Sequence, residues 1–271
     1  MKLKIGFASE SNDKKQEDTR AVAVETIIPR KSVVQVRFLV QGASLAYYND
    51  RFDLHVGDFV YVDGKMEGEL GRVTEVNYNF KIKLSDYKRV IAQVDTNVEG
   101  QFHFAGAHFV TFDRHALPAE KVALWFKAPR KDDDEMISGS DERSFGLDDL
   151  KSMKISPAIA ERGHEYYMEN KVVYISMDGE RGYAIVNGND AYEVEFEYCD
   201  GQISKLTCSC FCSYNCKHEF AAMLQLKETL ARIEESYSSE FERSGYFAAL
   251  LKKAFLAFAV DGNAKGSLVL N

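Results

Sequence analysis

The sequence has no long uninterrupted apolar run. The most apolar stretch near its end, YFAALLKKAFLAFAV (246–260), is divided by Lys252 and Lys253. It is shorter than the roughly 20 residues that a membrane-spanning helix needs. The N-terminus, MKLKIGFASESNDKKQEDTR, soon becomes highly charged and lacks the apolar core of a signal peptide. We therefore expect neither export nor a transmembrane helix.

Cysteine and proline are scarce. The 271 residues include five cysteines and four prolines, and 45% of the residues are hydrophobic. An odd number of cysteines, most of them crowded into one short stretch, does not suit a disulfide framework. The composition predicts a folded globular chain, long enough for two domains, with reduced thiols. We therefore expect a cytoplasmic protein.

An excess of basic residues is also missing. Lysine and arginine number 34 against 42 acidic residues, so the formal net charge is −8. A protein that coats nucleic acid through its overall charge needs the opposite balance. This mode of binding is excluded, whereas a local basic patch is not.

The first part of the chain has the pattern of a β domain. Short β-branched and aromatic runs, such as VVQVRF and DFVYVDG, alternate with turn residues between Ser32 and Asp113. The pattern GDxVxV (57–62) followed by GRVxxV (71–76) resembles the small, strongly bent barrels of KOW-like and Tudor-like modules. In such folds glycines permit tight turns between strands. We predict a β-barrel-like domain over residues 1–127.

An acidic linker is predicted over residues 128–150. The segment APRKDDDEMISGSDERSFGLDDL combines a proline, a run of four acids and glycine-serine spacing. This composition is typical of a solvated connection, although the acid run could also be a partner-binding tail. A second domain is then expected over residues 151–271.

The second domain has helix and hairpin signals. Ser156 is a candidate N-cap with Pro157 at the first helical position. Asp-Gly or Asn-Gly pairs at 178–179, 187–188 and 200–201 separate the strand-like runs that follow, and such pairs favour tight hairpin turns. These signals predict a helix and a four-stranded meander whose last strand, QISKLTCSC, carries a bulge. The segment YFAALLKKAFLAFAV is predicted to be a packed C-terminal helix.

The last strand of this meander begins the most informative stretch, TCSCFCSYNCKHEF (207–220). Cys208 and Cys210 lie two residues apart, so on a strand both thiolates face the same side. The end of this strand thus provides two neighbouring sulfur ligands on one face.

A second pair of candidate ligands, Cys216 and His218, opens a predicted helix. In CKHEFAAMLQLKETLARIEE, apolar residues recur at helical spacing. The N-terminus of a helix favours thiolate over thiol, which is the form that a metal binds. Two sulfurs from a strand end and a sulfur–nitrogen pair from a helix start suit one tetrahedral structural zinc with no open position.

The pattern Cys-x-Cys, a short spacer, Cys-x-His and an amphipathic helix resembles the SWIM zinc finger family, and all four positions match. The preceding AERGHEYYMENKVVYI is similar to the Arg-Gly-x-x-Tyr-Tyr segment found before such fingers in bacterial proteins, including those fused to Snf-type helicases. The resemblance spans residues 158–230. It implies a zinc-dependent module that binds DNA or protein partners.

Other interpretations of the cysteines remain open. Cys212 could replace one of the four ligands, and all of them could be ordinary buried cysteines. A redox pair would more naturally have the spacing Cys-x-x-Cys. Cys199 lies beside a turn and is expected to be inert.

A second metal site could be formed by His103, His108 and His115 with Asp113. Their spacing is irregular, and the odd offset places His103 and His108 on opposite faces of a continuous strand. We therefore do not expect this group to bind a metal.

A basic cluster in the N-terminal part is the candidate contact for nucleic acid. Lys81, Lys83, Lys88 and Arg89 lie within nine residues, interleaved with aromatic residues that could stack bases. Lys81 and Lys83 are expected to share one face of a strand. A barrel core with a lysine-rich edge strand would explain the same residues.

Together these features predict an α+β protein: a β-barrel-like domain, then a helix, β-meander, zinc finger and helix. No catalytic triad, phosphate-cradling glycine loop or carboxylate pair stands out, so we expect no enzyme. The expected function is zinc-dependent interaction with DNA, RNA or a nucleic-acid-processing protein such as a helicase. The alternative is an adaptor that binds only protein, with a purely structural zinc. Neither a membrane nor a small-molecule substrate is expected.

Overall fold

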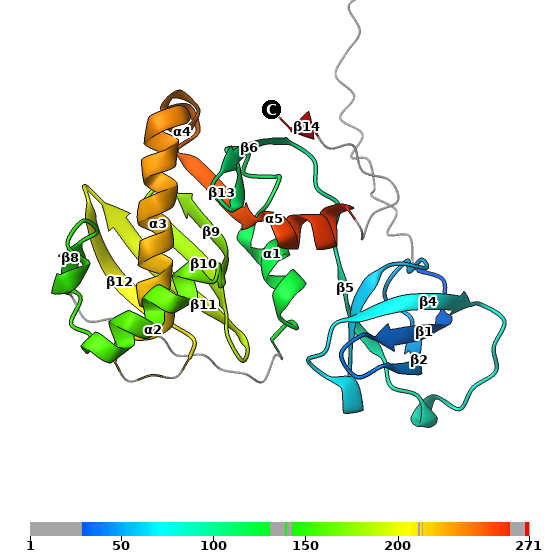
Figure 1. The fold of residues 1–271 in the computed structure, drawn as a ribbon. Coiled ribbons are helices and arrows are strands. Elements are labelled where there is room, and N and C mark those ends of the chain that lie inside the picture. Colours follow the sequence, from blue (N-terminus) through cyan, green and yellow to red (C-terminus); the bar gives the residue numbers. More distant parts are fainter. Residues whose placement is uncertain are drawn as a thin grey trace, which may run out of the picture.

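A computed structural model describes residues 29–130, 139, 143–210, 212, 214–260 and the backbone of 269–270. Over these residues the protein has a mixed α+β fold built around two sheets (Figure 1). The predicted α+β class is thus confirmed. Residues 131–138 and 140–142 of the predicted acidic linker, 11 of its 23 residues, lie outside the described residues.

The first sheet has five strands in the order β2-β1-β4-β3-β5. Alternate residues of β1 are buried, as in Val34, Val36 and Phe38, because successive side chains of a strand point to opposite faces. A bridge between Tyr48 and Arg89 brings β2 next to β5, so the sheet curls around its own core. The strands are β1 (Ser32–Phe38), β2 (Ala43–Asn49), β3 (Phe59–Val62), β4 (Gly71–Asn77) and β5 (Val90–Val94).

The second sheet has nine strands in the order β14-β6-β7-β13-β9-β10-β11-β12-β8. Its β6 and β7 precede residue 127, so the chain passes from one sheet to the other between Val94 and Gln101. The strands are β6 (Gln101–Ala105), β7 (His108–Thr111), β8 (Ser144–Gly146), β9 (Val172–Asp178), β10 (Arg181–Asn187), β11 (Ala191–Cys199), β12 (Gln202–Cys208), β13 (Tyr246–Leu251) and β14 (Val269–Leu270).

The predicted four-stranded meander is confirmed as β9 to β12, all paired antiparallel. Asp200 and Gly201 turn between β11 and β12 with φ of 49° and 80°, as the Asp-Gly pair requires. The pairing of β11 with β12 shifts register between Glu195 and Glu197, and Lys205 has φ of 51°. The last strand therefore carries the predicted bulge.

The predicted C-terminal helix over 246–260 is wrong for its first six residues. Tyr246–Leu251 is strand β13, which pairs with β7 on one side and β9 on the other. A short apolar run buried on both faces has no alternation, so periodicity cannot distinguish a central strand from a buried helix. Only the following Lys252–Phe255 (α5) and the π-helical turn Leu256–Val260 (η4) are helical.

Helices cover both faces of the nine-stranded sheet. The face that carries Ile175, Val194 and Phe196 packs against α3. The opposite face, with Tyr174 and Ile185, packs against α1 and Phe255 of α5. The remaining elements are α1 (Ala119–Phe126), α2 (Pro157–Met168), α3 (Lys217–Ser236), α4 (Ser238–Ser244) and the short 3-10 turns η1 (Gly64–Met66), η2 (Leu84–Asp86) and η3 (Leu150–Ser152).

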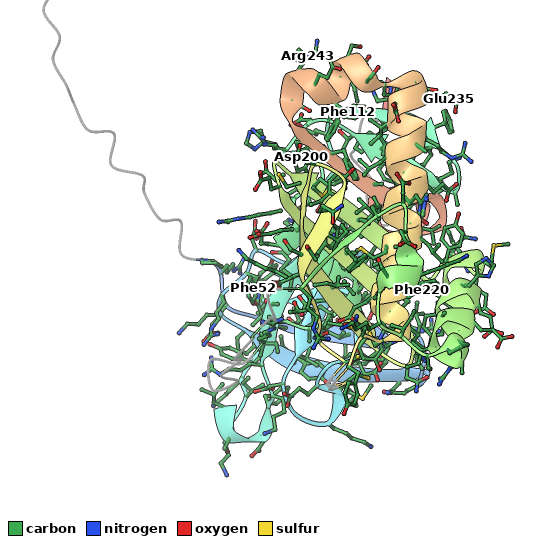
Figure 2. All side chains as sticks on the ribbon, turned by 90° about the vertical axis from the view of Figure 1, so that its left-hand side faces the viewer. Phe52, Phe112, Asp200, Phe220, Glu235 and Arg243 are labelled. Carbon is green, nitrogen blue, oxygen red and sulfur yellow. The ribbon has the colours of Figure 1, made fainter. Side chains whose placement is uncertain are left out.

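Helix α2 begins as predicted and lies against the start of α3. The Ser156 hydroxyl accepts a hydrogen bond from the Ile159 N–H, and Pro157 opens the helix. Phe220 marks the end of α3 that meets α2, and Glu235 marks its other end (Figure 2). Within the described part of the chain, no helix has the length and apolar character needed to cross a membrane.

Gly163 permits this close contact. A Cβ at this position would lie 2.9 Å from both the Lys217 carbonyl oxygen and the Phe220 Cβ. Replacing a helical glycine by alanine usually stabilises a protein by about 0.5–1 kcal/mol. Here we expect Gly163→Ala to lower the free energy of unfolding by about 1–3 kcal/mol, because α2 must move off α3.

Urea unfolding of Gly163→Ala and of Glu161→Ala, an exposed residue on the same helix, would check this. The control should change stability by no more than about 0.5 kcal/mol. An increase in stability for Gly163→Ala would show that the contact does not constrain the helices.

Candidate metal centre

The four predicted ligands come together at the junction of β12 and α3. Cys208 ends β12, Cys210 follows two residues later, Cys216 is the N-cap of α3, and His218 lies in its first turn. One ligand atom from each residue lies within 4.8 Å of all the others. This compact three-cysteine, one-histidine cluster fits a metal ion.

The strand side of the cluster is held by pairing with β11. Val194 lies opposite Cys208 in the ladder. Beyond the strand, the Ser209 N–H donates to the Glu193 carbonyl oxygen at 2.9 Å, and the Glu193 N–H donates to the Ser209 hydroxyl at 3.0 Å. These bonds extend the pairing through the Cys208-Ser209-Cys210 segment, so both thiols stay on the side that faces α3.

The helix side of the cluster is held by a capping box. The Cys216 sulfur accepts from the Glu219 N–H at 3.5 Å, and the Glu219 carboxylate accepts from the Cys216 N–H at 2.8 Å. Sulfur takes the place that a serine or threonine oxygen usually occupies in this motif. The same residue therefore starts the helix and contributes a ligand.

The spacing of the ligand atoms suits a tetrahedral ion. His218 Nδ1 lies 3.7 Å from the Cys208 sulfur and 3.7 Å from the Cys216 sulfur. A tetrahedral zinc with Zn–S of about 2.3 Å and Zn–N of about 2.0–2.1 Å places sulfur and nitrogen about 3.6 Å apart. Nδ1 is therefore the histidine atom positioned to coordinate.

The His218 ring is fixed by aromatic stacking. Its side chain is buried, and the Tyr192 ring stacks on it with centroids 4.1 Å apart at 18°. Its Nε2 atom has no hydrogen-bond partner among the described residues. A metal-binding histidine usually donates from its second nitrogen, so here stacking performs the orienting role.

The thiols have strongly shifted proton affinities. A hydrogen bond from Cys208 lowers the pKa of Cys216 to about 4 against the effect of burial, and His218 and the Glu219 N–H act in the same direction. Donating that hydrogen bond raises the pKa of Cys208, and burial raises it further. Burial, followed by a hydrogen bond with Cys212, raises the pKa of Cys210 to about 12. A metal ion bound here would displace the protons of the thiols, because it is the thiolate that binds a metal.

The other two cysteines lie outside the cluster. Cys212 is exposed and does not belong to the group of four. Cys199 is also exposed, and its sulfur lies 3.1 Å from the Glu180 carboxylate. Neither residue is in the place of a ligand.

The histidine group does not form a second metal cluster. His108 is buried and its Nε2 lies 2.8 Å from the Val172 carbonyl oxygen. The His103 ring instead contacts the ring of Tyr237, with centroids 4.9 Å apart. Among the described residues, the only group with metal-ligand spacing is the Cys208 cluster.

The predicted strand that carries Lys81 and Lys83 is wrong. β4 ends at Asn77, whose side-chain oxygen accepts from the Asn79 N–H at 2.8 Å and turns the chain. Both lysines therefore lie in an irregular segment before η2 and share no strand face.

The four basic residues differ in their surroundings. Lys81, Lys83 and Lys88 are exposed. Arg89 instead pairs with Asp50 at 2.5 Å and lies over the Tyr48 ring. The structure thus leaves three of these cations facing solvent and holds the fourth against an acid.

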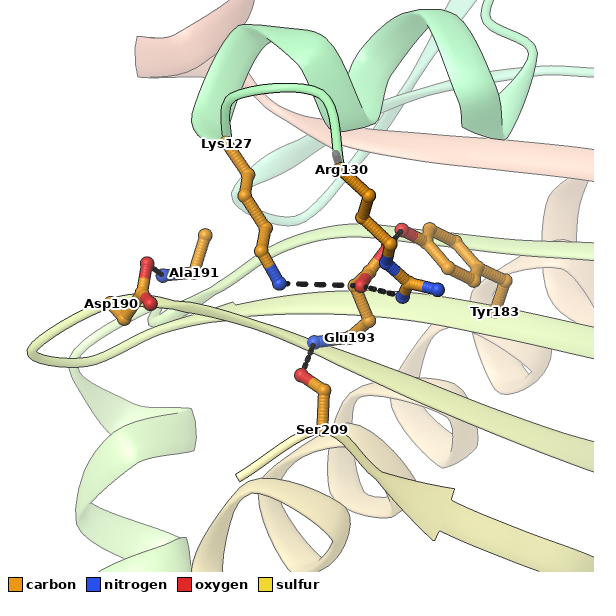
Figure 3. A network of polar contacts seen from close by, with 7 residues as sticks. All are labelled: Lys127, Arg130, Tyr183, Asp190, Ala191, Glu193 and Ser209. Atoms are coloured by element: carbon orange, nitrogen blue, oxygen red, sulfur yellow. Dashed lines mark hydrogen bonds and ion pairs between the residues drawn. The ribbon is translucent and has the colours of Figure 1, made fainter. Parts of the chain in front are cut away.

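Glu193 occupies an alternating position typical of a solvent-facing residue, but it is half-buried in a polar network (Figure 3). Its carboxylate accepts from Tyr183 at 3.0 Å and from Arg130 at 2.5 Å, and it pairs with Lys127 at 3.4 Å. No local signal could reveal this network, because the cations arrive from the segment after α1. The network joins that segment to the strand that supports the metal cluster.

This network makes stability depend on pH. Burial alone would raise the pKa of Glu193, but Arg130, Tyr183 and Lys127 together hold it below its ordinary value of 4.5. Its stabilising contribution is therefore present above the unfolded pKa and is lost as pH falls through the lower folded value. We expect Glu193→Gln to lower stability by about 1–3 kcal/mol at pH 7 and to reduce the pH dependence below about 4.5.

Chemical unfolding at pH 7 and at pH 3.5 would measure both effects. The control is Glu195→Gln, an exposed residue on the same face of β11. Equal responses of the two variants would contradict a specific role for Glu193.

No protein-family model, curated protein or solved structure matches this chain. The class of protein is therefore defined by the fold and the site: a mixed α+β protein with a cluster of three cysteines and one histidine that fits a metal ion.

Proposed function

We propose that the chain is a zinc-stabilised, non-catalytic interaction module of the SWIM type whose target is nucleic acid or a nucleic-acid-processing protein. The observation that carries the proposal is the Cys208, Cys210, Cys216 and His218 cluster. It ties a strand end to a helix start, so an ion held there would fix the surface around it.

The donor set supports zinc in a structural role. Three thiolates and one imidazole are ligands that zinc prefers, and reduced cytoplasmic thiols would be available to bind it. The sulfur–nitrogen distances of 3.7 Å agree with tetrahedral coordination. Four protein ligands complete the coordination sphere of a tetrahedral ion and leave no position for a substrate. This favours a structural role for the metal over a catalytic one.

The order of elements around the cluster supports the SWIM type. Helix α2 carries Arg162-Gly163 and Tyr166-Tyr167, the meander follows, and the ligands then span the end of β12 and the start of α3. Gly163 lies against Lys217, and Tyr166 lies 5.5 Å from the His218 ring. The upstream motif thus packs against the ligands, which gives a physical reason for the two to occur together.

Nucleic acid as the target is supported by the segment between β4 and β5. Exposed Lys81, Lys83 and Lys88 lie near aromatic rings, including Phe80, which contacts Tyr48 with centroids 6.2 Å apart. Cations that hold phosphates beside rings that stack bases are typical of single-strand binding.

A protein-only adaptor is the second candidate. The net charge of −8 opposes a polyanion, and Asp50 neutralises Arg89. Binding to nucleic acid would then depend on only three exposed lysines, each of which adds about 0.7–0.9 to the salt slope.

Charge reversal tests the target. We expect Lys81→Glu/Lys83→Glu/Lys88→Glu to abolish binding to labelled DNA and RNA and its salt dependence, without loss of zinc. The matched control reverses Lys151, Lys154 and Lys253, which are also exposed, and should retain most of the affinity. Fluorescence anisotropy with single- and double-stranded probes gives both affinity and salt slope.

Other outcomes of this experiment have defined meanings. Loss of binding by Lys217→Glu alone would assign the contact to the finger. Equal losses of affinity in the triple variant and its control would mean that binding depends only on the overall charge of the protein. Absence of wild-type binding at low salt would favour the protein-only adaptor.

A further inference from the structure

A hollow of about 480 Å³ lies beside the metal cluster, between α2, β11 and the start of α3. We name it the finger hollow. Besides the cluster's own residues, it is lined by Ile159, Arg162, Tyr192, Cys212, Tyr214, Asn215 and Lys217.

The finger hollow offers an apolar and aromatic surface. Tyr214 is 84% exposed, which is unusual for a large ring beside a concave site. Tyr192 is half-buried, and stacking on His218 fixes its ring. Rigid tyrosines beside a pocket commonly anchor protein–protein contacts, since they supply area at little cost in conformational entropy.

Two cations lie among the lining residues. The Lys217 ammonium is held 4.3 Å from the centre of the Tyr166 ring. Arg162 is exposed on α2 and has no ion pair in the described part of the chain. Both charges are therefore available to an acidic group that enters from solvent.

The surrounding charges favour a short acidic segment over a polyanion. Glu161 and Glu165 are exposed on the same helix as Arg162. The negative charge of Asp190 lies close enough to Tyr192 to raise its pKa, after the larger effect of burial. A nucleic-acid backbone would meet these acids together with only two cations, whereas its affinity depends on neutralising several phosphates. One or two carboxylates can instead be placed against Arg162 and Lys217 alone.

We propose that the finger hollow binds a segment of a protein partner that inserts one apolar or aromatic side chain and sets an adjacent acidic side chain against Arg162 and Lys217. The inference rests on the proposed function in one respect: the metal holds Cys210, Cys216 and His218 in the wall of the hollow. Nucleic acid, if bound, would contact the separate lysines before β5.

Selection from a random peptide library displayed on phage, against the zinc-loaded full-length protein, tests this. The selected peptides should share an apolar residue next to aspartate or glutamate. Arg162→Glu and Tyr214→Ala should each weaken their binding by about tenfold or more. Arg243→Glu should leave it unchanged, because Arg243 is also exposed but lies in α4, at the far end of α3 (Figure 2).

Three results would overturn the inference: selected peptides without acidic residues, peptide binding that survives both Arg162→Glu and Tyr214→Ala, or no selected peptide at all. Competition by a single-stranded oligonucleotide with the same residue dependence would reassign the hollow to nucleic acid. Zinc content measured on the same samples separates the two proposals, because a zinc-free native protein would refute both, whereas a zinc-loaded protein without hollow-dependent peptides would refute only this one.

Discussion

We expect Cys216→Ser and His218→Ala to purify without bound zinc and with the second sheet largely unfolded. Binding free energy at small structural zinc sites is folding free energy, of order 10 kcal/mol. A whole domain is stabilised by only about 5–15 kcal/mol. Cys216 also caps α3, so its loss weakens the helix start as well. Elemental analysis and thermal unfolding followed by circular dichroism would measure both effects.

The matched controls are Cys212→Ser and His164→Ala. Cys212 is a neighbouring cysteine outside the cluster, and His164 is exposed on α2. Both variants should retain zinc and melt within a few degrees of the wild type. Loss of zinc on Cys212→Ser, with retention in Cys208→Ser, would mean that the ligand set is different from the one the geometry indicates.

Truncation after Gly245 should have the second large effect. It removes β13, the strand that joins β7 to β9, together with the Phe255 ring that packs against Phe102 at 5.0 Å. Loss of β13 would divide the nine-stranded sheet and expose two edges that can aggregate. Phe247, Ala248, Ala249 and Leu250 are all 0% exposed, and burying each large side chain contributes about 1.5–3 kcal/mol.

We therefore expect the truncated chain to be insoluble or to lack a cooperative transition. Truncation after Val260 leaves β13, α5 and η4 in place and serves as the control. A chain ending at Gly245 that melts like the control would show that β13 does not hold the two parts of the sheet together.

The metal cluster was predictable because its determinants are local. Cys208 and Cys210 need only a strand, and Cys216 with His218 needs only a helix start within the next few residues. The Asp200-Gly201 turn and the amphipathic pattern after Cys216 specify both elements. Folding of the meander then places the two pairs beside one another.

Features that depend on distant partners were not predictable. The run 246–251 is a strand because β7 and β9 lie on either side of it, and neither is near it in sequence. Glu193 alternates like a solvent-facing residue, but Lys127 and Arg130 reach it from a segment more than sixty residues earlier. The end of β4 could have been predicted, because the asparagine turn at 77–79 is a local signal. The prediction missed it because the strand-like composition of the surrounding residues was given more weight.

X-ray absorption spectroscopy of the natively purified, reduced protein at the zinc edge tests the central claim most directly. The account predicts one zinc per chain, with three sulfur scatterers at about 2.3 Å and one nitrogen at about 2.0–2.1 Å. Protein that contains no metal, or a zinc whose shell is dominated by oxygen or nitrogen, would contradict it.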